Sequence, residues 1–167
     1  MAELTQKERL QPSLLDRLTD DEPGQLQEPR DKRVLSMHKL RQSVFRDIAW
    51  LLNADSLETV ENLDDYPEVA ASVLNYGIKS LSGSTVSGGN LAQIERNVKQ
   101  AILQFEPRIL PNTLNIQMTS SEDKMNRLAI VFDIEADLWA QPLPLHLYLR
   151  TEINKMTGDV NLRDLGG

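Results

Sequence analysis

Hydrophobic residues recur at intervals of three and four along residues 90–110, NLAQIERNVKQAILQFEPRIL. This spacing predicts a helix with one buried face. That face would consist of Leu91, Ile94, Val98, Ala101, Ile102 and Phe105. We expect Asn90 to be the N-cap, with Gln93 reaching back as in a capping box. Pro107 ends the pattern, because the residue before a proline is forced out of the helical region. We expect the rest of the fold to be arranged around this helix.

A second amphipathic pattern over residues 34–52 predicts another helix, earlier in the chain. Its apolar stripe consists of Leu40, Val44, Ile48 and Leu51, with Phe45 and Leu52 beside them. Ser36 suits the N-cap position, and Trp50 is expected at the edge of the buried stripe. The charged residues should lie largely outside the stripe; they are Lys39, Arg41, Arg46 and Asp47.

The segment between these two helices is less regular. Residues 53–66 are an acidic connector, and the Tyr66–Pro67 pair leads into a predicted short helix over residues 68–76. Its inner side would carry Val69, Val73 and Tyr76. Gly77 should end this helix, because glycine adopts the left-handed backbone common at helix ends. Residues 80–89, SLSGSTVSGG, are expected to be a flexible loop, since they lack the ending of a phosphate-binding loop.

After residue 110 the apolar residues alternate with polar ones, which predicts strands. We expect strands over residues 112–119, 127–138 and 145–153, with a short last strand carrying Val160 and Leu162. Short links imply an antiparallel sheet, and helices followed by strands give an α+β domain. The predicted fold therefore has helices packed on one face of a small antiparallel sheet. The edges of such a sheet can accept a strand from another chain.

The first 33 residues are predicted to be an extension before a single α+β domain at residues 34–167. Within it, QPSLLDRLTDDEP predicts a short helix capped by Ser13. It carries three leucines, Leu14, Leu15 and Leu18. So short a helix is marginal alone; it either folds back on its own domain or anchors in the groove of a partner. We expect the extension to be partly ordered, and mobile in the free protein.

Composition narrows the function classes. The 167-residue chain has a net charge of −7, which repels phosphate and disfavours nucleic-acid binding. The absence of cysteine excludes a disulfide scaffold and thiolate zinc sites. No apolar run approaches the roughly 20 residues that span a bilayer, and the charged start does not resemble a signal peptide. We therefore expect a soluble, cytoplasmic protein without direct membrane insertion.

The sequence offers little for catalysis or cofactor binding. Its two histidines, His38 and His146, lie outside any catalytic or zinc-binding motif, so surface roles are expected. The acidic connector lacks the spacing of a calcium-binding loop. Along the second predicted strand, Asp133, Glu135 and Asp137 lie close together without an obvious apolar pocket. Neither a metal nor a cofactor is predicted.

Glu106, Pro107 and Arg108, here called the charged corner, place two opposite charges on either side of a rigid proline. If Glu106 and Arg108 meet, the guanidinium stabilises the charged carboxylate, whereas a general acid must hold a proton. We therefore interpret Glu106 as half of a structural or interfacial ion pair. The alternative that the residues leave open is that Glu106 acts as the general acid of a glycoside-cleaving enzyme.

Three features together resemble a known family. They are QPSLLDRLTDDEP, the charged corner at the end of the central helix, and the order of LRQSVFRDIAWLLN, VLNYGIKSLSG and IERNVKQAILQFEPRIL before the strands. From about Leu10 to Leu162 the chain resembles TssE, the small baseplate subunit of the bacterial type VI secretion system. TssE is similar to the baseplate wedge proteins of contractile phages, a family once labelled lysozyme-like. That older label implies the alternative function, a peptidoglycan-cleaving muramidase that uses Glu106.

The resemblance implies a non-enzymatic part of a cytoplasmic baseplate wedge. It would join TssF and TssG, near TssK and the inner tube, and would seed the sheath of TssB and TssC. In that family the sheet presents strands that sheath segments extend, and the charged corner contacts neighbouring wedge subunits. Outside the corner, the predicted partner-binding residues are Leu14, Leu15, Leu18, Ala129, Val131, Asp133, Tyr148 and Arg150. An adaptor unrelated to secretion is a further interpretation.

Overall fold

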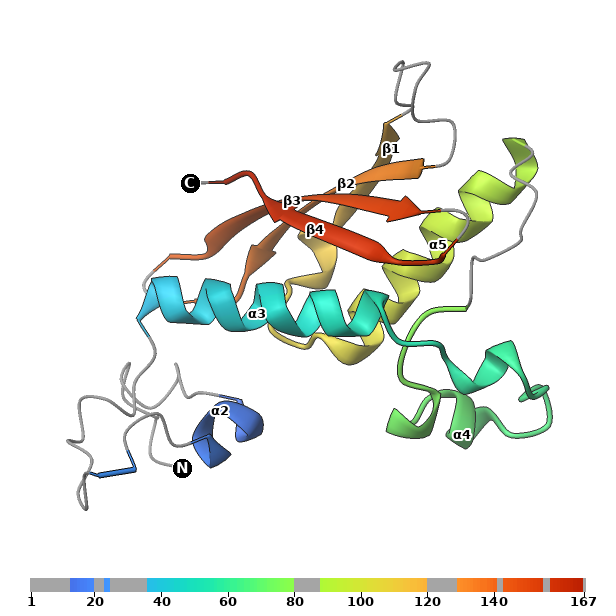
Figure 1. The fold of residues 1–167 in the computed structure, drawn as a ribbon, viewed down its shortest axis with the longest axis horizontal. Helices are drawn as coiled ribbons and strands as arrows, with labels where there is room; N and C mark the ends of the chain where they lie inside the picture. The colour runs from blue at the N-terminus through green and yellow to red at the C-terminus, as the bar shows by residue number, and fades with distance from the viewer. Residues whose placement is uncertain are drawn as a thin grey trace.

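The computed structural model of this chain describes residues 13–19, 23–24, 36–79, 88–119, 129–140, 143–154 and 157–166 (Figure 1). Its helices are α2 (Leu14–Leu18), α3 (Met37–Leu52), α4 (Pro67–Ala70) and α5 (Gly88–Phe105). Single 3₁₀ turns follow α3, α4 and α5 as η2 (Leu57–Thr59), η3 (Val73–Asn75) and η4 (Pro111–Thr113). The strands are β1 (Asn115–Thr119), β2 (Ala129–Leu138), β3 (Leu145–Asn154) and β4 (Val160–Asp164).

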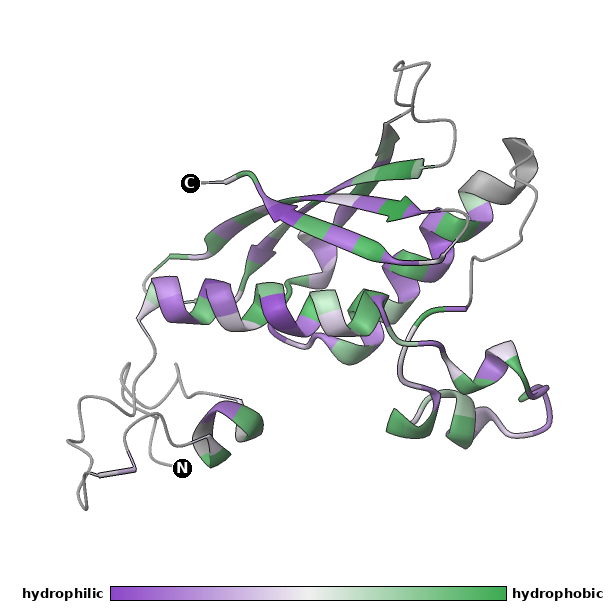
Figure 2. Ribbon diagram, in the orientation of Figure 1, coloured by the Kyte–Doolittle hydropathy of each residue, from purple (hydrophilic) through white to green (hydrophobic). Residues whose placement is uncertain are grey.

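The four strands form one antiparallel sheet in the order β1-β2-β3-β4, so each strand pairs with its neighbour in the chain. Helices α3 and α5 lie along one face of this sheet (Figure 1). Buried positions alternate with half-buried or exposed ones along β2 and β3, and Figure 2 shows apolar and polar residues alternating along the strands. The predicted α+β class, with helices on one face of a small antiparallel sheet, is confirmed.

The core lies between the sheet and the two long helices. Side chains with no exposed surface come from both layers: Val44 and Ile48 of α3, Ile102 of α5, Phe132, Ile134 and Leu138 of β2, and Leu147 and Leu149 of β3. Burial of apolar surface stabilises a fold by about 25 cal/mol for each Å², so these side chains contribute strongly to the stability of the domain. No helix in the described part of the chain is long and apolar enough to cross a membrane.

Helix α3 follows the prediction. Ser36 is its N-cap, and the Ser36 side chain accepts a hydrogen bond from the backbone N–H of Lys39. The helix ends at Leu52, and Asn53 follows as its C-cap. Trp50 is half exposed. The guanidinium carbon of Arg46 lies 5.0 Å from the centroid of the Trp50 ring, which is a cation–π contact at the edge of the stripe.

Helix α5 differs from the prediction at its start. It begins at Gly88, so Asn90 lies inside the first turn and the N-cap prediction is wrong. The capping-box role of Gln93 is also wrong. Its side chain donates to Asn97 at 2.7 Å and accepts from Arg96 at 2.7 Å. These i,i+3 and i,i+4 contacts along the helix surface replace the reach back to the helix start. The predicted loop over residues 80–87 lies outside the described residues.

The predicted helix over residues 68–76 is divided into α4 and η3. Ser72 separates them, because its hydroxyl donates to the Val69 carbonyl and accepts from the Leu74 N–H, which gives the chain an alternative to helix. Val73 is consequently exposed, so its predicted inward position is wrong. Tyr76 packs edge-on against Phe105 of α5, with ring centroids 5.3 Å apart. Gly77 ends the segment with a positive φ of 125°.

The strands agree with the alternation, with changed boundaries. β1 begins at Asn115 instead of residue 112, because Pro111 starts the turn η4. β3 ends at Asn154, and the turn before β4 contains Gly158 with a φ of 81°. The predicted link between β1 and β2, and Arg127 and Leu128 at the predicted start of β2, lie outside the described residues.

Candidate functional site

The charged corner is held between α5 and the end of β2. The helix closes with a hydrogen bond from the Glu106 N–H to the Ile102 carbonyl, and Pro107 then turns the chain. Beyond the turn, the Arg108 carbonyl accepts from the Trp139 N–H at 2.7 Å. The Leu110 N–H donates to the Asp137 carbonyl at 2.9 Å. The backbone of the corner is therefore fixed on both sides before any side chain contributes.

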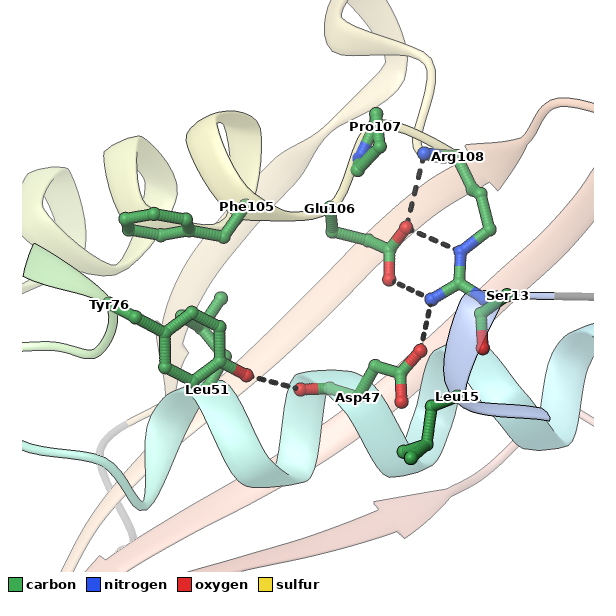
Figure 3. Close-up of a pocket in the computed structure, with 9 residues that line it drawn as sticks. All are labelled: Ser13, Leu15, Asp47, Leu51, Tyr76, Phe105, Glu106, Pro107 and Arg108. Carbon is green, nitrogen blue, oxygen red and sulfur yellow. Dashed lines mark hydrogen bonds and ion pairs between the residues drawn. The ribbon is translucent and has the colours of Figure 1, made fainter. Parts of the chain in front are cut away.

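Glu106 and Arg108 form the predicted ion pair (Figure 3). Nε of Arg108 lies 2.6 Å from Oε1 of Glu106, and Nη2 lies 2.5 Å from Oε2. The Arg108 backbone N–H also donates to Oε1 at 3.1 Å. Both carboxylate oxygens are thus engaged in a two-pronged contact. Glu106 is only 3% exposed, so it supports Arg108 from beneath, while Pro107 faces solvent.

Two residues of α3 complete the corner. Nη2 of Arg108 lies 2.5 Å from Oδ2 of Asp47, and Nη1 donates to Oγ of Ser43 at 3.0 Å. Burial lowers the pKa of Arg108, but the hydrogen bonds and charges of Glu106 and Asp47 outweigh it and raise that pKa. The sequence prediction missed both partners. The available signal was their spacing, since Ser43 and Asp47 are four residues apart and share one helix face.

The N-terminal helix α2 lies next to the charged corner and contacts α3 there. Its predicted cap is confirmed, since Oγ of Ser13 accepts from the Asp16 N–H. Asp16 pairs with Arg46 of α3, with Oδ1 and Nη1 2.5 Å apart. Arg46 in turn donates to Oδ1 of Asp47 from Nη2, at 2.7 Å. The predicted extension therefore contacts the domain through a charged side chain.

A hollow of about 440 Å³ lies beside the charged corner (Figure 3). It is lined by Ser13, Leu15, Asp47, Leu51, Tyr76, Phe105, Glu106, Pro107 and Arg108. Burial, followed by the charges of Asp47 and Glu106, raises the pKa of Tyr76. The hollow contains two acids, but the Arg108 guanidinium lies between their carboxylates and binds both. Both carboxylates that line the hollow are therefore bound by the same guanidinium, and the arrangement fixes a charged surface.

The other predicted site residues lie on the outer face of the sheet. Arg150 of β3 pairs with Asp133 directly opposite on β2, with Nε and Oδ1 2.8 Å apart. Asp133 and Tyr148 line a second hollow of about 320 Å³ that shares no residue with the first. Ala129 and Val131 are half-buried.

His146 also lies on this outer face. It is exposed beside two acids, with Nδ1 3.0 Å from Asp137 and Nε2 3.4 Å from Glu135. Its predicted surface position is confirmed.

The three predicted partner-binding leucines of α2 differ in their surroundings. Leu15 lines the first hollow, whereas Leu18 is 74% exposed, and the Leu14 side chain lies outside the described residues. The structure therefore brings the charged corner and α2 together and places the outer-face residues apart from them. In the part of the chain that the structure describes, no group of three or more His, Asp or Glu side chains could hold a metal ion.

The sequence of residues 38–143 matches a family described as baseplate wedge protein gp25. The chain belongs to this family. The matched range includes α3, α5, the charged corner and the strands β1 and β2. Membership in the gp25 family supports a structural role in a contractile baseplate and contacts with other baseplate subunits.

Two further comparisons add little to this family assignment. A solved structure from Geobacter sulfurreducens, described as a tail lysozyme, is similar with 21% sequence identity and a TM-score of 0.44. The similarity covers 69% of this chain and 90% of that one. No curated protein matches the chain in sequence.

Proposed function

We propose that this gp25-family protein is the TssE-like subunit of a type VI secretion baseplate, a cytoplasmic structural part that joins wedge subunits through its charged corner. The observation that carries the proposal is the arrangement of Arg108. Its guanidinium binds Glu106, Asp47 and Ser43 at once, on a backbone fixed by Pro107. A surface with so little freedom left loses little entropy when a partner docks. TssF and TssG are the proposed partners at the corner, with TssK and the inner tube nearby.

The sheet supports the second part of the proposal, that sheath segments of TssB and TssC add strands to it. The Asn154 N–H donates to the Asp159 carbonyl, and the Leu165 N–H donates to the Tyr148 carbonyl. These two bonds lie on either side of β4 and show that its odd-numbered residues direct their backbone groups toward β3. By alternation, the N–H and C=O groups of Val160, Leu162 and Asp164 point to the outer edge.

Asn53 occupies the first of these outward positions. Its side-chain amide donates to the Val160 carbonyl and accepts from the Val160 N–H, both at 3.0 Å. A single side chain therefore takes the place that a neighbouring strand would have at Val160. A strand that adds to this edge would begin its pairing at Leu162.

Co-purification from the native host tests the corner. The tagged wild-type protein should retain TssF and TssG, and Arg108→Glu should lose them, because the reversed charge meets Glu106 and Asp47 directly. Arg96→Glu is the matched control, since Arg96 is exposed on α5, outside the charged corner, and donates to Gln93. Circular dichroism should be used to check that both variants are folded before their partners are compared. Failure of the wild type to retain TssF or TssG, or their retention by a folded Arg108→Glu variant, would overturn the proposal.

The muramidase alternative has its own assay. A suspension of purified peptidoglycan should keep its turbidity when the protein is added, because both oxygens of Glu106 are already bound by Arg108. Clearing by the wild type that disappears in Glu106→Gln would show that this carboxyl group acts as an acid after all.

A further inference from the structure

Five charged side chains form a continuous series from the end of α5 to α2. Glu106 binds Arg108, Arg108 binds Asp47, Asp47 binds Arg46, and Arg46 binds Asp16. The signs alternate along the series, and each contact is 2.5–2.7 Å. The series crosses α3 and joins two segments that are separated by 90 positions in the sequence, residues 16 and 106. No local pattern in the sequence predicts such a connection.

The charge of the last member decides whether α2 is held. Without Asp16, the other four side chains carry two negative and two positive charges and are neutral together. Asp16 joins them through Arg46, and α2 has only five residues, so its own helical stability is small. Of the α2 leucines whose side chains the structure describes, Leu15 and Leu18 are 44% and 74% exposed, so these two bury little apolar surface on the domain. The attachment of α2 therefore depends on the local balance of charge.

We propose that the charged corner and α2 are coupled through this series, so that a partner carboxylate bound to Arg108 releases α2 from the domain. A carboxylate at Arg108 adds one negative charge to a neutral group of four, and the resulting excess repels Asp16. Release of α2 removes Leu15 from the hollow that it lines, which frees this side chain for a second contact and gives the assembly an order. By reciprocity, the docking of α2 and the binding of a carboxylate at the corner oppose each other to the same extent. This inference rests on the proposed docking role of the corner.

The coupling predicts opposite effects for two neutral substitutions at the corner. Arg108→Gln leaves an excess negative charge near Arg46, so α2 should be released more often. Glu106→Gln leaves an excess positive charge, so α2 should be held more tightly. For partly exposed charges we expect each change to shift the ratio of released to docked α2 by about two- to fivefold. The shifts should shrink as salt is added, because ions screen charges over about 10 Å at 0.1 M.

The absence of cysteine allows a direct measurement in the full chain. Spin labels at Leu18→Cys on α2 and Gln100→Cys on α5, both at exposed positions, report the distance between α2 and the domain by pulsed electron paramagnetic resonance. The matched controls are Arg150→Gln and Asp164→Asn. Each removes one charge from an ion pair that lies outside the series, with Asp133 or with Arg41. Asp16→Asn provides the reference for released α2, and circular dichroism verifies the fold of every variant.

The expected result is a larger released fraction in Arg108→Gln, a smaller one in Glu106→Gln, and wild-type distances in both controls. Equal distances in the two corner variants, or a shift in the same direction for both, would overturn the coupling. So would an Asp16→Asn variant in which α2 stays docked. Because the measurement needs no partner protein, its failure would leave the co-purification test of the proposed function unaffected.

Discussion

Arg108 and Asp47 are 61 positions apart in the sequence, yet Nη2 of Arg108 lies 2.5 Å from Oδ2 of Asp47. This contact fastens the charged corner to α3, while the pair with Glu106 fixes its local shape. Because Glu106 is almost fully buried, the corner cannot lose Arg108 without leaving a buried charge unpaired. The residue proposed to meet partners is therefore also part of what stabilises the fold.

Substitutions at Arg108 should show how much its charge and its planar geometry each contribute to the free energy of unfolding. Arg108→Ala should lower the free energy of unfolding by about 3–5 kcal/mol, the usual cost of leaving a buried carboxylate uncompensated. Arg108→Lys keeps the charge but loses the planar fork, and should cost about 1.5–3 kcal/mol. Urea denaturation followed by circular dichroism gives both values. Arg150→Ala is the control, because its pair with Asp133 is exposed to solvent and should contribute far less to stability than the buried pair of Arg108. A similar loss at positions 108 and 150 would contradict this account.

The contact between Asn53 and Val160 gives a second test. Asn53→Ala removes two hydrogen bonds to the backbone of Val160, so the free energy of unfolding should fall by about 1–3 kcal/mol. Amide hydrogen exchange should be faster at Val160 than in the wild type. Asn62→Ala is the matched control, because the Asn62 side chain bonds only a nearby N–H in an exposed loop. Unchanged exchange at Val160 would show that the side chain does not protect this edge.

The regular elements could be predicted because their signals are local. The alternation over residues 145–153 led to a strand that the structure places at Leu145–Asn154, and the apolar stripe with Ser36 led to α3. Short links between strands left little choice of topology. The start of α5 could not be found in this way, because two glycines before Asn90 carry no helical signal, although the helix includes them.

The candidate site was only half predictable. The pair of Glu106 and Arg108 is local, and the rigid Pro107 between them made their meeting a reasonable expectation. Asp47 and Arg46 join them only because α3 packs beside the corner in one particular rotation. That rotation is set by the packing of both helices on the sheet and not by the sequence near either residue. Asp47 and Arg46, which the sequence predicted only as surface charges of a helix, are thus part of the candidate site.

Gly77 should be intolerant of any side chain. Its φ of 125° is unfavourable for other residues, and a Cβ at this position would lie 2.4 Å from the Ala54 carbonyl oxygen. Gly77→Ala should therefore lower the free energy of unfolding by at least about 2 kcal/mol, measured by urea denaturation. Gly24→Ala is the control, since a Cβ there meets no atom within 4 Å, and it should leave stability unchanged. Equal stability of the two variants would refute the steric argument.

The attachment of α2 should weaken in acid. Burial raises the pKa of Asp16, but hydrogen bonds from Arg46 and Ser13 and the charge of Arg46 outweigh it, so the pKa lies below its ordinary value of 3.8. A lowered pKa means that the stabilisation is fully present above the ordinary value and is lost as the pH falls through the pKa of the docked state. The spin-label distance should therefore lengthen at low pH. Asp16→Asn should show no such step; an identical step in that variant would assign it to another carboxyl group.

The stability of the protein should fall in alkali, as Tyr76 beside the hollow loses its proton. Burial, then the charges of Asp47 and Glu106, raise the pKa of Tyr76 above its ordinary value of 10.0. The unfolded chain then loses its proton first, so the stabilisation is fully present below pH 10 and disappears as the pH rises through the pKa of the folded state. Absorbance near 295 nm should show a late tyrosine component that Tyr76→Phe removes. The same component should move to lower pH in Asp47→Asn, because one of the two nearby negative charges is gone. A late component that survives in Tyr76→Phe would show that the charged wall of the hollow does not control this hydroxyl group.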